Sequence, residues 1–210
     1  GSALVILFSL LVPRNTLNDV WAEYFDKSTL QRQSSDYARA HLTSTNSVAF
    51  SLAAAESNGI TDPLYLAEVD KFAEWLRQHP FVSHVYSFTD VMKRINKNMH
   101  GDDPAWYKLP DDRELAAQYL LMYELSLPFG LDVNNQVNMG KSATKLLVTA
   151  KNSSTSDMLA FQQDAQAWLR ANAPEYMYHP GASGDIMFAH IGHNNIRSML
   201  SGTVLALLAI

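Results

Sequence analysis

The stretch His100-Gly101-Asp102-Asp103-Pro104 places one imidazole and two carboxylates within a single turn of the chain. At this spacing the three groups could bind a hard metal ion, or exchange protons with a substrate as a general acid and base. The alternative is a turn whose Asp side chains accept hydrogen bonds from the nearby backbone. No second cluster of His or carboxylate residues stands at partner spacing elsewhere, so the sequence favours the turn.

Other patterns that could support chemistry are incomplete. His190 and His193 could both face one side of a helix as metal ligands, but a solvated helix end accounts for them equally well. Gly140-Lys141-Ser142 resembles the end of a phosphate-binding loop, yet Asn135 occupies the upstream position that requires Gly. No Gly-x-Ser-x-Gly motif marks a nucleophilic Ser. We therefore predict that the chain is not an enzyme and has no catalytic residue, no metal site and no cofactor.

Aromatic residues are concentrated in one part of the chain, between the two halves of the domain predicted below. They are Trp106, Tyr107, Tyr119, Tyr123 and Phe129. Aromatic side chains can line an apolar groove for a lipid-like ligand, which makes these five the candidate substrate-binding residues. They can also belong to the hydrophobic core, and the sequence leaves both interpretations open.

Composition describes a mildly acidic globular chain. Of its 210 residues, 47% are hydrophobic and 18% are charged, and the formal net charge is −5. No basic run alternates with aromatic residues, which argues against a nucleic-acid partner. Cysteine is absent, so disulfides and thiolate metal sites are excluded.

Hydrophobic periodicity and helix-capping residues predict the elements that position these side chains. Helices are predicted over 29–41, from Asp62 to Pro80, over 89–99, from Asp111 to Pro128, and from Ser154 to Pro174. Strands are predicted over 46–53, 81–88, 143–150 and 175–179. This order indicates an α+β fold, a ferredoxin-like split βαββαβ arrangement with a helical insertion and with its helices on one face of a four-stranded sheet. Trp168 falls on the apolar stripe of its helix and Trp75 does not, so we expect replacement of Trp168 by Ala to cost about 3–5 kcal/mol of stability and replacement of Trp75 much less.

Both ends of the chain are apolar. Residues 3–12 read ALVILFSLLV before Pro13 and Arg14, and the last residues read MLSGTVLALLAI. Each run supplies about half of the ~20 residues that a membrane span needs, and the first lacks the basic leader and cleavage site of a signal peptide. We predict that residues 1–13 end one transmembrane helix, 14–197 form a water-exposed domain, and 198–210 begin the next transmembrane helix. The alternative is a signal anchor followed, at the other end, by a core helix.

One long stretch resembles a known family. Residues 87–132, SFTDVMKRINKNMHGDDPAWYKLPDDRELAAQYLLMYELSLPFGLD, are similar to the periplasmic loop of RND-superfamily exporters of the MMPL-like group. Further pieces agree in order, namely LNDVWAEYFD at 17–26, SATKLLVT at 142–149 and FAHIGHNNIRSML at 188–200. The resemblance covers nearly the whole chain.

This resemblance implies a bacterial inner-membrane permease that exports hydrophobic or lipid-like substrates, and places the present chain in the periplasm as a porter-type domain. Its partners would be the membrane lipid or other hydrophobic substrate and the remainder of the same permease, with a homo-oligomer as a further option. Proton coupling would lie in transmembrane helices outside this chain. The alternative functions are an extracellular ligand-sensing domain of a membrane receptor and a membrane-anchored enzyme.

Overall fold

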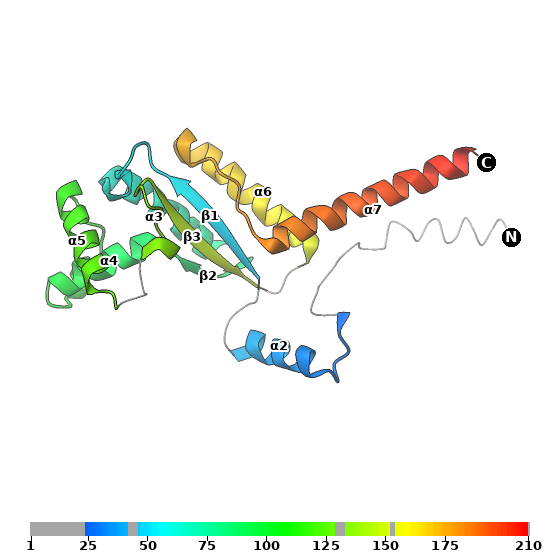
Figure 1. The fold of residues 1–210 in the computed structure, drawn as a ribbon, viewed down its shortest axis with the longest axis horizontal. Helices are drawn as coiled ribbons and strands as arrows, with labels where there is room; N and C mark the ends of the chain where they lie inside the picture. Colours follow the sequence, from blue (N-terminus) through cyan, green and yellow to red (C-terminus); the bar gives the residue numbers. More distant parts are fainter. Residues whose placement is uncertain (1–23, 42–45, 129–132, 152–153, 210) are drawn as a thin grey trace.

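The computed structural model describes residues 24–41, 46–128, 133–151 and 154–209. This part of the chain is an α+β structure with six α-helices and a three-stranded sheet (Figure 1). The helices are α2 (Leu30–His41), α3 (Pro63–Gln78), α4 (Phe88–Met99), α5 (Arg113–Ser126), α6 (Thr155–Asn172) and α7 (Gly184–Ala209). The strands are β1 (Ser47–Ala53), β2 (Val82–Tyr86) and β3 (Ala143–Ala150).

Local capping decides where most helices begin. The Asp62 carboxylate accepts a hydrogen bond from the backbone N–H of Leu64 at 2.8 Å, with Pro63 as the first residue of α3. Ser154 and Asp157 form a reciprocal capping box at the start of α6. These helix starts, and the strand Ala143–Ala150, confirm the predictions from sequence.

Two predicted boundaries were displaced because a different residue provides the cap. Ser87 accepts a hydrogen bond from the backbone N–H of Thr89 at 3.2 Å, so Phe88 is already helical and β2 ends earlier than predicted. Asp112, and not Asp111, caps α5 by accepting from the Leu115 backbone N–H at 2.8 Å.

The sheet has the strand order β1-β3-β2, and both pairings are antiparallel. β3 is the central strand, and β1 and β2 pair with its two edges. Phe50 of β1 lies opposite Leu146 of β3, and Tyr86 of β2 lies opposite Leu147. The pairing of β2 is irregular between Val82 and His84. β2 lies at one edge of the sheet and is only five residues long.

The predicted strand over 175–179 is wrong. Glu175–Met177 form a 3₁₀ turn, in which the Met177 N–H donates to the Pro174 carbonyl at 3.0 Å, and Met177 is fully buried. The chain meets the sheet slightly later, where Ala182 forms an isolated antiparallel bridge with Ala49 through hydrogen bonds of 2.8 and 2.9 Å. No fourth strand is present in the described residues.

The hydrophobic core lies between one face of the sheet and the helices α3 and α6. The ring of Phe50 on β1 meets Phe72 of α3 at a centroid distance of 5.2 Å and Phe161 of α6 at 6.2 Å. The residues of the strands that face these helices are fully or nearly buried, whereas Ser51 and Lys145 on the other face are exposed. Such alternation is expected of a sheet with one covered face.

Trp75 of α3 and Trp168 of α6 are both partly buried against this core. Their rings stack on each other at 5.6 Å, and each also stacks on Phe72, at 6.0 and 5.2 Å respectively. Both rings thus belong to one aromatic cluster, and this gives no structural reason for a much larger cost at Trp168 than at Trp75. The fold places α3 beside α6. Trp75 therefore packs against Trp168 although it lies outside the apolar stripe of its own helix.

A buried polar contact links α3 to the sheet. The Tyr65 hydroxyl donates to the Leu52 carbonyl at 2.8 Å and lies 2.7 Å from the Thr144 hydroxyl. Tyr65 is 3% exposed. Burial raises the pKa of Tyr65 to about 12, because ionisation would place a charge in this apolar interior.

The remaining helices lie outside these two layers (Figure 1). α4 and α5 lie together at one end of the sheet, and α7 packs on α6 near its start before extending away from the domain. Residues 198–209 are the last turns of the continuous helix α7, and residues 1–13 lie outside the described residues. Across the described ranges, none of the helices has both the length and the apolar character needed to span a membrane.

Candidate functional site

A pocket of about 1000 Å³ lies beside β2 and is bounded by α3, α4 and α5. This volume is at the upper end of the range of small-molecule sites. Its apolar and aromatic lining comprises Val85, Tyr86, Val91, Ile95, Met99, Tyr107, Met122 and Tyr123. Its polar lining comprises Glu74, Arg77, His84, Ser87, Asp90, Lys93, Arg94, Asn98, Ser126 and Gln136.

The walls of the pocket are positioned by the helix starts described above. Ser87 is the single residue between the end of β2 at Tyr86 and the start of α4 at Phe88, so the strand leads directly into the helix. From α4, the residues Val91, Arg94, Ile95 and Asn98 all line the pocket, at the spacing of one helix face. α5 contributes Met122, Tyr123 and Ser126.

Ion pairs fix most of the charged side chains of the lining. Arg77 bonds to Asp90 at 2.6 Å and to Glu74 at 2.5 Å. Burial opposes the charge of Arg77, but the Asp90 and Glu74 carboxylates outweigh it and raise the pKa of the guanidinium. Lys93 pairs with Asp70 at 2.6 Å, and both side chains are largely buried. These pairs also hold α3 and α4 together along the pocket.

The structure separates the five candidate aromatic residues. Tyr107 and Tyr123 line the pocket. Tyr119 is instead a core residue, 6% exposed, whose hydroxyl donates to Asn96 at 3.1 Å. Trp106 is outside the pocket lining and stacks on His100 at a centroid distance of 3.6 Å. Phe129 lies outside the described residues.

The loop over residues 100–104 is held as a turn by its own side chains. His100 Nδ1 lies 2.8 Å from the Asn96 carbonyl, and the Asp103 carboxylate accepts from the Ala105 N–H at 2.9 Å. Gly101 and Asp102 both have positive φ angles, 69° and 64°. These local bonds account for the residue types that first indicated chemistry.

The other two patterns also have structural roles. His190 lies 3.0 Å from the Gln162 side-chain oxygen and joins α7 to α6, while His193 is exposed. Lys141 pairs with Glu124 of α5 at 2.8 Å. Among the described residues, no three His, Asp or Glu side chains gather where they could hold a metal ion.

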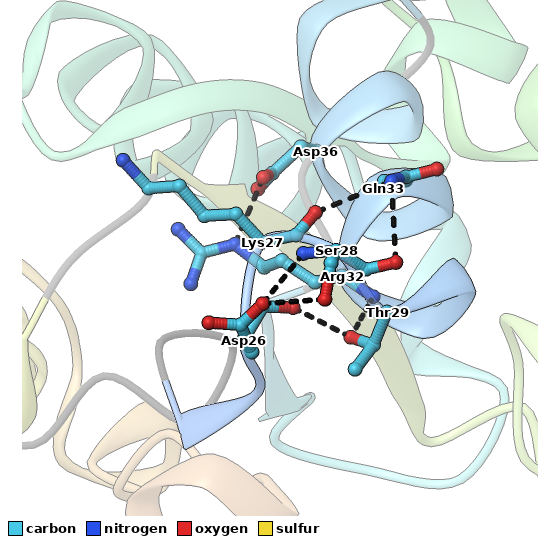
Figure 2. A network of polar contacts seen from close by, with 7 residues as sticks. All are labelled: Asp26, Lys27, Ser28, Thr29, Arg32, Gln33 and Asp36. Atoms are coloured by element: carbon cyan, nitrogen blue, oxygen red, sulfur yellow. Dashed lines mark hydrogen bonds and ion pairs between the residues drawn. The ribbon is translucent and has the colours of Figure 1, made fainter.

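A separate polar network surrounds the start of α2 (Figure 2). Asp26 accepts hydrogen bonds from the Ser28 hydroxyl at 2.6 Å and the Ser28 N–H at 2.9 Å, which lower the pKa of this exposed carboxyl. Thr29 Oγ1 accepts from the Arg32 N–H at 3.4 Å, and the Arg32 side chain bonds to Asp36 at 2.8 Å. The contacts drawn in Figure 2 lie within residues 26–36, where they help to cap the start of α2, and none of these residues lines the pocket.

Comparisons of the chain with family models, with curated proteins and with solved structures find no match. The site is therefore interpreted from its own chemistry. Sequence reasoning found Tyr107 and Tyr123 but missed the contributions of α3, β2 and α4. The polar spacing of Asp90, Lys93 and Arg94 along α4 was the available signal, because side chains three and four residues apart share a helix face.

Proposed function

We propose that this chain is the periplasmic substrate-handling domain of an RND-superfamily, MMPL-type exporter in a bacterial inner membrane. Its pocket between β2, α3, α4 and α5 receives a hydrophobic or lipid-like substrate, and the energy comes from proton coupling elsewhere in the permease. The observation that carries the proposal is the pocket itself, which combines a volume of about 1000 Å³ with a lining that includes apolar and aromatic side chains from β2, α4 and α5.

The finer fold that we propose is a porter-type, ferredoxin-like βαββαβ unit. In support, the observed order β1-β3-β2 is antiparallel throughout, and α3 and α6 cover the same face of the sheet. The Ala182 bridge pairs with β1 on the side away from β3, where the fourth strand of such a unit belongs. In this interpretation the fourth strand is reduced to one bridge, and α4 with α5 forms the insertion.

The lining favours a flexible apolar ligand. Met99 and Met122 expose 52% and 38% of their surface, respectively, although both line the pocket. Methionine side chains are flexible and polarizable, and they adapt to ligands of different shapes. An exposed pair of this kind on facing helices suits an alkyl chain better than a rigid polar substrate.

The C-terminal helix supports attachment to a membrane. The apolar side chains Val204, Leu205, Leu207 and Leu208 of α7 are 55–79% exposed, beyond the part that packs on α6. Large exposed apolar patches commonly mark contact with lipid or with another protein. In the proposed permease these residues continue into the next transmembrane helix.

The test uses a single cysteine in the full-length permease, expressed without other cysteines. This chain has none of its own. Met122→Cys places a thiol in the pocket, and Gln118→Cys places one on an exposed site of the same helix, one turn earlier and outside the lining. Both sites should react with a bulky, membrane-impermeant maleimide in intact spheroplasts.

Labelling at Met122→Cys should then block release of lipid from the cells, while labelling at Gln118→Cys should leave it unchanged. Labelling only after lysis would contradict the periplasmic location. Equal transport by both labelled variants would contradict a conduit through the pocket and would favour a ligand-sensing domain.

A further inference from the structure

The charged side chains that line the pocket differ in whether they form an ion pair. Both lining carboxylates, Glu74 and Asp90, bond to Arg77, and Lys93 pairs with Asp70. Arg94 also lines the pocket, and it has no ion pair within the described ranges of the chain. Among the described residues, Arg94 is therefore the cation of the lining that has no carboxylate partner, whereas the Arg77 guanidinium already serves two carboxylates.

We propose that the pocket binds an amphiphile with an anionic headgroup, and that Arg94 is the residue that binds this headgroup. The inference rests on the proposed function and specifies its substrate class. A planar guanidinium can form two parallel hydrogen bonds to a phosphate or a carboxylate, which makes an unpaired Arg a suitable ligand for either. A cationic headgroup would be repelled by Arg94 and would have to compete with Arg77 for Glu74 and Asp90.

The surroundings of Arg94 explain why the anion should carry an apolar tail. Val91 lies three residues before Arg94 on α4, and Ile95 lies one residue after it. All three side chains line the pocket. Met122 contributes a further apolar side chain from α5. A headgroup bound at Arg94 thus lies beside an apolar wall, where each methylene removed from water is stabilising.

Arg94 is exposed, so its replacement by an uncharged residue of similar length should leave the fold intact. Arg170 of α6 provides the matched control, since it is also an exposed Arg and lies outside the pocket lining.

The experiment is isothermal titration calorimetry on the purified 210-residue chain, with each amphiphile kept below its micelle-forming concentration. The ligands are dodecyl phosphate, dodecyltrimethylammonium and inorganic phosphate. We expect dodecyl phosphate to bind more tightly than either of the others. Arg94→Gln should weaken the binding of dodecyl phosphate by about tenfold or more, as expected for loss of a hydrogen bond between charged groups. Arg170→Gln should leave it unchanged, and Arg94→Lys should retain part of the affinity.

Equal affinity for the anionic and cationic amphiphiles, or an Arg94→Gln variant that binds as well as the parent chain, would overturn the proposal. Inorganic phosphate binding as tightly as dodecyl phosphate would also overturn it, because the site would then recognise a free anion and not an amphiphile. If dodecyl phosphate binds as expected but pocket labelling leaves transport unchanged, the binding site stands and the exporter function fails. Circular dichroism of each variant verifies that it is folded.

Discussion

Trp75 and Trp168 should behave as one energetic unit, although they lie on different helices. Full burial makes replacement of Trp by Ala cost about 3–5 kcal/mol of unfolding free energy. Both rings are only partly buried, so each single replacement should cost about 2 kcal/mol. Because the rings stack on each other at 5.6 Å, part of each cost is shared.

A double-mutant cycle measures this shared part. Stacked aromatic pairs contribute about 0.5–1.5 kcal/mol beyond the area that they bury. The variant with both replacements should therefore lose less stability than the sum of the single losses, by that amount. Urea unfolding followed by far-UV circular dichroism gives the unfolding free energies of the parent chain and the three variants, and it does not depend on the fluorescence of the residues removed.

Trp106→Ala is the matched control, since Trp106 stacks on His100 at the surface and is not part of the core. It should cost less than either core replacement. A loss at Trp168 several times that at Trp75, or strictly additive losses, would refute the shared cluster and would mean that α3 and α6 do not pack as described.

Two further predictions follow from single buried contacts. Burial raises the pKa of Tyr65 to about 12, whereas Tyr in an unfolded chain has a pKa of about 10. The contribution of Tyr65 to stability is therefore fully present below pH 10, and the unfolding free energy should fall by about 2–3 kcal/mol between pH 10 and 12. Urea titrations of the parent chain and Tyr65→Phe across this range check it, since the variant should lack this part of the decline. Gly181→Ala should cost about 1–3 kcal/mol, because the new Cβ would lie 2.7 Å from the Phe50 ring. Gly184→Ala, where the added Cβ meets no atom within 4 Å, should have no comparable cost, and thermal unfolding of the two variants should show a clear difference.

Features that depend on neighbouring residues in the sequence were predictable. Asp62 with Pro63, and Ser154 with Asp157, specify helix starts through bonds within one turn, and the structure confirms both. The segment 175–179 was predicted wrongly because its strand-forming residues follow Pro174, whose carbonyl starts a 3₁₀ turn that buries Met177. Burial of one side chain outweighed local β-propensity there.

The candidate site could be predicted only in part. Tyr107 and Tyr123 were identified because they belong to a cluster of aromatic residues, but Tyr119 in the same helix as Tyr123 turns into the core. The pocket also needs the edge strand β2 and α3, which the fold brings next to α4 through long-range packing. The spacing of residues within one segment cannot predict such a long-range contact.

Photocrosslinking in the membrane tests most directly whether the pocket receives lipid. A lysophospholipid with a diazirine in its acyl chain would be activated in membranes that contain the full-length permease, and the attachment sites would be mapped by mass spectrometry. We predict attachment to residues of β2, α4 and α5 that line the pocket, such as Tyr86, Met99 and Met122, and loss of this attachment when excess unlabelled lipid is added. Attachment confined to α7, or attachment that excess lipid does not reduce, would contradict a substrate site in the pocket.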